Sequence, residues 1–156
     1  ISKDRSFFAQ WLAHLSIGFF IVAAVYTEQF DYEKNITFEK GDNNEMALDK
    51  DTSLLIENIK DSDLSNHQKI SVDLIVVEKN LKYSLSPSKN IYQPSGQVTN
   101  EVSTVNRYFD QYYATISMIE SDKVSINLVF KPFINLLWIS SILLVFSIFL
   151  SIIKRK

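Results

Sequence analysis

The sequence predicts a membrane protein in which two transmembrane α-helices flank a mainly-β domain, a small barrel or sandwich. Two apolar runs, Phe7–Tyr26 and Phe133–Ile153, bracket a polar middle segment, and neither contains Asp, Glu, Lys or Arg. Each run holds about 20 residues, which at 1.5 Å per residue matches the roughly 30 Å of bilayer hydrocarbon. Between the runs, apolar and polar residues alternate with a period of two, as in strands with one buried face.

The distribution of charge predicts the orientation of the two spans. The segment 28–130 holds seventeen acidic residues against ten basic ones, a net charge of −7. Basic residues outside the spans gather at the two ends of the chain, at Lys3, Arg5 and 154–156. Cytoplasmic segments of membrane proteins carry the excess of Lys and Arg. The sequence therefore predicts a cytoplasmic end at 1–6, helices at 7–27 and 132–153, an outer β-rich domain at 28–131 and a cytoplasmic tail at 154–156.

Six or seven short strands are expected in the middle domain. The alternating segments are Lys34–Glu39, Ser53–Ile59, Ile70–Val77, Leu81–Leu85, Tyr112–Ile119 and Val124–Phe130. Polar stretches at 41–51, 61–68 and 87–97 are expected to be loops. Asn80 is expected to adopt a positive φ in a hairpin turn. Arg107–Tyr113 fits either a helical turn or a strand.

His14, inside the first apolar run, is the residue most indicative of function. Ionisable residues in membrane spans are costly and usually serve a function. On a helix, Gln10, His14 and Gly18 lie four residues apart and share one stripe. A flat cofactor can approach the backbone at Gly18 and be ligated by the imidazole, since a low-dielectric medium disfavours the protonated ring that cannot bind iron. The alternative is a histidine that hydrogen bonds across a helix interface, as Gln10 also can.

Several classes of chemistry are excluded or disfavoured by composition. The chain has no cysteine, which excludes thiol exchange, iron–sulfur clusters and disulfides. The acidic middle segment argues against nucleic acid as a partner. His67 is the other histidine and is expected to be an exposed loop residue, so a second axial imidazole within the membrane must come from outside the chain. That shortage, and a start at Ile1 rather than Met, favour a fragment of a longer polypeptide. A signal peptide is the alternative for the first run, but the length of the run and its Gln10 and His14 favour an uncleaved span.

Six segments, taken in order, resemble a known family. They are Trp11–Leu15 (WLAHL), Tyr32–Ile36, Ser88–Tyr92, Val98–Ser103, Phe109–Tyr113, and Phe130–Phe133 followed by Trp138. Together they resemble the C-terminal part of CcmF, the haem lyase of the bacterial and mitochondrial cytochrome c maturation system. WLAHL and the Lys-Pro-Phe segment before Trp138 are the more specific pieces.

The resemblance implies a bacterial or mitochondrial inner-membrane protein with its loop in the periplasm or intermembrane space. It implies that His14 is one of two transmembrane ligands of haem b, which reduces the haem being attached to an apocytochrome. The implied partners are the remainder of the lyase polypeptide, partner maturation subunits, apocytochrome c and membrane lipid. The family's tryptophan-rich WWD motif is absent, since Trp11 and Trp138 are the two tryptophans present, so this chain is not expected to catalyse attachment alone.

Two other classes of function stay open on the sequence. One is a two-span receptor or sensor whose β domain binds a ligand outside the membrane. The other is a cofactor-free structural subunit of a membrane complex. Loss of haem absorbance on replacing His14 separates both from a haem-binding segment.

Overall fold

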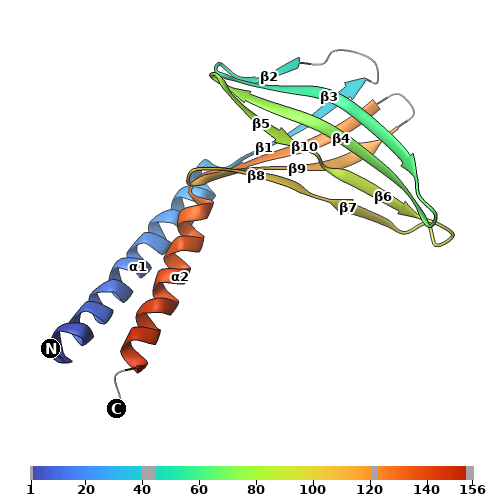
Figure 1. Cartoon of the computed structure of the whole chain (residues 1–156). Helices are drawn as coiled ribbons and strands as arrows, with labels where there is room; N and C mark the ends of the chain where they lie inside the picture. Colours follow the sequence, from blue (N-terminus) through green and yellow to red (C-terminus); the bar gives the residue numbers. More distant parts are fainter. Residues whose placement is uncertain (1, 40–44, 121–122, 154–156) are drawn as a thin grey trace. The chain divides into compact units, whose positions relative to one another are not determined.

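The computed structural model of the chain describes residues 2–39, 45–120 and 123–153, with side chains from Phe7 onward (Figure 1). The described residues form two helices and ten strands, grouped in two compact units. We call the first the helix unit. It comprises the chain up to Asp31, the segment Asn106–Gln111, and the chain from Lys131 onward. The second, the β unit, comprises Tyr32–Val105 and Tyr112–Phe130. This confirms the predicted fold class, two long apolar helices flanking a mainly-β domain.

The helix unit pairs α1 (Ser2–Phe30) with α2 (Ile134–Ile152), side by side and antiparallel (Figure 1). The stretches Phe7–Phe30 and Ile134–Ile152 are long and apolar enough to cross a membrane. Only 17% and 11% of the residues in their most apolar windows are buried, so most of their apolar side chains are exposed on this chain.

Small side chains line the contact between the two helices. Four described residues of α1 are buried: Ala9, Ser16 and Ala23 recur seven apart, and Thr27 lies in the last turn. In α2, Ser140 and Ser147 are buried, again seven apart. Small residues let helix backbones approach closely where lipid offers no hydrophobic driving force. The Ser16 hydroxyl donates a 2.7 Å hydrogen bond to the Leu12 carbonyl of its own helix, so burying it leaves no donor unpaired.

The β unit contains two antiparallel sheets. The first has the order β1-β10-β9-β8, with β1 at Tyr32–Glu39, β8 at Ser103–Arg107, β9 at Asp110–Ile119 and β10 at Lys123–Lys131. The ends of β9 and β10 reach into the helix unit. The chain's first and last strands pair in the register Tyr32↔Phe130 to Glu39↔Lys123.

The second sheet has the order β2-β3-β4-β6-β7, with β5 also paired to β4. Its strands are β2 (Glu45–Asp49), β3 (Thr52–Asp63), β4 (His67–Glu78), β5 (Leu81–Leu85), β6 (Ser88–Tyr92) and β7 (Val98–Glu101). β5 and β6 pair with successive halves of β4. A single residue, Val102, separates β7 from β8, so the chain passes between the sheets at one corner.

One apolar core holds the two sheets together as a sandwich. Alternate residues of strands in both sheets face it, so burial follows the period of two expected from the sequence. The first sheet supplies Ile36, Phe38, Tyr112, Ala114, Ile116, Val124, Ile126 and Leu128. The second supplies Leu48, Leu54, Val72, Leu74, Val76 and Leu85.

The predicted loops were wrong where stretches rich in polar residues form strands. Within 41–51, residues 41–44 lie outside the described part, but Glu45–Asp49 is β2. Within 61–68, only residues 64–66 connect strands, and 87–97 contains β6. In the β4–β5 hairpin the positive φ, 54°, belongs to Lys79 rather than Asn80. Arg107–Tyr113 is a strand end, a two-residue turn and the start of β9.

Candidate functional site

The predicted stripe on α1 lies on the exposed side of that helix. Gln10, His14 and Gly18 are all exposed. At 3.6 residues per turn, His14 lies roughly 180° around the helix from Ala23, which is buried against α2. The stripe therefore faces away from the partner helix. An interhelical hydrogen bond from His14 to α2 is incompatible with this arrangement.

The imidazole of His14 is oriented by its own helix. Its Nδ1 lies 2.7 Å from the carbonyl oxygen of Gln10, one turn earlier. A carbonyl can only accept, so Nδ1 carries the hydrogen and donates it. In the neutral ring the lone pair is then on Nε2. Metal-binding histidines commonly have this arrangement, in which a backbone carbonyl fixes the tautomer of the ligating ring.

Gly18 leaves space one turn from His14. Apart from its chain neighbours and the backbone of its own helix, a Cβ placed at Gly18 would have no atom within 4 Å, so a flat group can approach the backbone there. Trp11 and Leu15, 54% and 36% exposed, border the stripe with apolar surface. The neutral imidazole of His14 would suit haem iron as a ligand, and any further ligand would come from outside this chain. These roles for Gln10, His14 and Gly18 stay predictions.

α2 has an exposed apolar stripe of its own. An open groove of about 500 Å³ runs along one face of the helix, with residues at helical spacing. The lining residues are Trp138, Ser141, Ile142, Val145, Phe146 and Phe149. Surface of this kind suits contact with lipid or with a neighbouring transmembrane helix.

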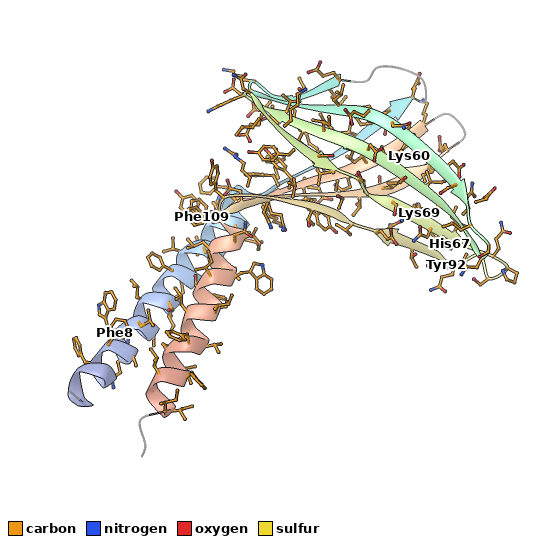
Figure 2. The ribbon with its side chains drawn as sticks, viewed as in Figure 1. Phe8, Lys60, His67, Lys69, Tyr92 and Phe109 are labelled. Atoms are coloured by element: carbon orange, nitrogen blue, oxygen red, sulfur yellow. The ribbon has the colours of Figure 1, made fainter. Side chains whose placement is uncertain are left out.

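His67 begins β4 and is half-buried, so the prediction of an exposed loop residue was wrong. Its ring packs against Tyr92 with centroids 5.0 Å apart, and its Nδ1 lies 2.7 Å from the side-chain oxygen of Asn66 (Figure 2). A cleft of about 220 Å³ adjoins it at the β3–β4 turn. In the described part of the chain, no group of three or more His, Asp and Glu side chains is placed to hold a metal ion.

The second sheet carries a polar network that sequence analysis missed. The Glu101 carboxylate accepts hydrogen bonds from Lys69 Nζ at 2.9 Å, Ser88 Oγ at 2.6 Å and Asn90 Nδ2 at 3.0 Å. These donors, Lys69 first, lower the pKa of Glu101 to about 2. Ser88 and Asn90 are buried on β6, and Lys69 lies on the neighbouring strand β4, where Figure 2 labels it. The sequence feature that could have revealed this network is the pair of small polar residues, Ser88 and Asn90, at alternate positions of Ser88–Tyr92.

A second carboxylate is held in the same way. Asp73 on β4 accepts hydrogen bonds from Lys60 Nζ at 2.7 Å and Ser86 Oγ at 2.9 Å. Lys60 and Ser86, in that order, lower the pKa of Asp73 below its ordinary value. Both carboxylates therefore have internal partners and act in the packing of strands.

No protein-family model matches the chain, and no curated protein matches it significantly. Among solved structures, it is similar to the cytochrome c haem lyase CcmF with a TM-score of 0.74, and the match covers 97% of this chain. The fold is that of a CcmF segment. The chain spans 25% of the length of the CcmF structure and is 10% identical to it. The resemblance to CcmF predicted from short motifs is thus confirmed at the level of the fold.

Proposed function

We propose that this chain is part of a haem lyase for cytochrome c maturation, in which it supplies a transmembrane haem b ligand and a periplasmic docking domain. The observation that carries the proposal is the likeness to CcmF over 97% of the chain, helices and β unit together. The remaining length of the lyase is the proposed source of the second axial ligand and of the attachment chemistry.

His14 is the proposed ligand, with Gln10 and Gly18 beside it. Gln10 holds the ring through its backbone carbonyl, so Nε2 is available to iron without a change of tautomer. Gly18 leaves the helix surface open to a flat ring system. Bound there, haem b supplies one-electron redox chemistry. Because α2 packs on the opposite face of α1, the stripe is proposed to face helices from the rest of the lyase.

The proposed location is the inner membrane of a bacterium or mitochondrion, with both termini in the cytoplasm or matrix. Lys3 and Arg5 support this orientation, and the tail 154–156 supports it by sequence while lying outside the described residues. The β-rich domain at 28–131 would then face the periplasm, where apocytochrome c and partner subunits are the proposed contacts. Because the chain has no cysteine, the orientation is testable with Ser2→Cys and Met46→Cys and an impermeant maleimide. Labelling of intact cells is expected at Met46→Cys alone.

Replacing His14 with alanine in the complete haem lyase tests the proposal. We expect loss of the Soret absorbance of haem b in the purified protein and loss of holocytochrome c in cells. His67→Ala is the matched control, since it removes the other histidine and is expected to leave the spectrum unchanged. In a His14→Gly variant, added imidazole is expected to restore the Soret band. An unchanged spectrum in His14→Ala would refute haem ligation and favour a cofactor-free scaffold.

A further inference from the structure

The turn between β8 and β9 belongs to the helix unit, although the strands on either side pair in the first sheet. Its backbone is fastened to the start of α2. The Asn135 side chain donates to the Tyr108 carbonyl at 3.0 Å, and the Asn135 amide donates to the Phe109 carbonyl at 3.0 Å. The Asp110 carboxylate accepts from the Phe133 amide at 3.0 Å. The turn is therefore held at the level where the second apolar span begins.

This fastened turn presents a large aromatic side chain to its surroundings. Tyr108 is 87% exposed and has a φ of 49°, in the left-handed region that side chains other than glycine seldom adopt. Phe133, the first residue before α2, has a φ of 56°. Strained residues persist where neighbouring contacts determine them, as Asn135 and Asp110 do here. The fold thus holds Tyr108 outward at some cost, without using its ring in the core.

A chain of aromatic rings continues from this turn across the ends of both helices. The ring of Phe109 stacks on Phe133 at 6.4 Å, Phe133 meets Tyr26 at 5.1 Å, and Tyr26 meets Phe30 at 4.8 Å. Figure 2 labels Phe109 at this end of the helix pair. The rings therefore form one band at the level where α1 ends and α2 begins.

Polar groups mark the side of this band away from the spans. Lys131 and Asp31 form an ion pair just outside the two helices. In the other direction, exposed apolar residues begin within two turns, at Trp138 and Ile139. Charged groups on one side and hydrocarbon-facing groups on the other define a membrane–water boundary.

We propose that the Tyr108–Phe109 turn is a membrane anchor that inserts into the interfacial region of the outer leaflet of the lipid bilayer. Tyrosine suits this position because its ring is apolar and its hydroxyl is polar, which is why aromatic residues are enriched at bilayer interfaces. We assign lipid as the partner of this turn because the aromatic band is continuous with the exposed apolar surface of both spans. The proposal requires that the helices cross a membrane, but it does not require haem.

Depth-dependent quenching of a single tryptophan tests the anchor. The chain has two tryptophans, Trp11 and Trp138, so both can be replaced by phenylalanine and one introduced as Tyr108→Trp, which keeps an aromatic ring. Met46→Trp in the same background reports the depth of the β unit. A chain in which only Trp11 is replaced keeps native Trp138 and reports the depth of the second span. Each full-length chain is reconstituted in phosphatidylcholine–phosphatidylglycerol vesicles with lipids brominated near the headgroup or near the chain end.

Tyr108→Trp is expected to be blue-shifted and quenched more by bromine near the headgroup than near the chain end. The fluorescence of Met46→Trp is expected to be quenched by neither brominated lipid, whereas the fluorescence of Trp138 is expected to be quenched. Resistance of Tyr108→Trp to both lipids, with Trp138 quenched, would overturn the anchor and leave the proposed function intact. Resistance of Trp138 as well would overturn the membrane placement on which both proposals depend.

Discussion

Replacing Asp110 with alanine is expected to loosen the first turn of α2. The carboxylate accepts the Phe133 amide at 3.0 Å, and a hydrogen bond to a charged group contributes about 1.5–3 kcal/mol. The Arg107 guanidinium is 3.9 Å from the same carboxylate in a partly exposed pair, which adds about 0–1 kcal/mol. An opening free energy lowered by about 1.5–3 kcal/mol speeds amide exchange roughly 10- to 150-fold.

Hydrogen exchange followed by mass spectrometry, on the full chain in lipid nanodiscs, measures this change. Faster exchange is expected in the peptide that covers Phe133–Leu137, with no change in β4. Asp110→Asn retains an oxygen acceptor and is expected to have a smaller effect, and Asp63→Ala removes an exposed carboxylate as a control. Equal exchange in Asp110→Ala and the unmodified chain would refute the role assigned to this carboxylate.

Three further predictions concern the core, the polar network and the helix contact. Leu74→Ala is expected to cost about 2–5 kcal/mol in urea unfolding, because Leu74 is fully buried, whereas Leu81→Ala at an exposed position is expected to cost much less. The stability that Glu101 adds is present above its ordinary pKa and is lost as pH falls toward its folded pKa of about 2. The difference in unfolding free energy between the unmodified chain and Glu101→Gln should therefore shrink over that range. A difference that stays constant with pH would contradict this prediction. Ala23→Leu is expected to cost about 1–3 kcal/mol and to widen the spin-label distance between α1 and α2, unlike Val22→Leu at an exposed position.

Hydropathy and alternation were sufficient to predict the fold class. The apolar runs form helices because no proline or charged residue interrupts them. The segment Val124–Phe130 forms β10 because its alternate apolar residues face one core. β6 was missed because its buried positions, Ser88 and Asn90, are polar and pair with Glu101 on β7. A period of two in small polar residues is hard to distinguish from a loop without knowledge of that partner.

For the candidate site, helical periodicity predicted that Gln10, His14 and Gly18 share one face, and all three are exposed. It did not predict which face contacts α2, because apolar residues surround the helix on every side. The seven-residue spacing of Ala9, Ser16 and Ala23 contained that information. The Tyr108 turn was beyond prediction, since its position depends on Asn135, far along the chain.

The corner at Val102 has a consequence for how the β unit can open. Because β7 and β8 are separated by one residue, the two sheets cannot part at that edge without losing strand pairing. At the opposite edge, β1 and β2 are fastened by a side chain, the Lys34 ammonium donating to the Leu48 carbonyl. Opening of the sandwich is therefore expected to start at the edge formed by β1 and β2, where the Lys34 hydrogen bond links the sheets, rather than at Val102.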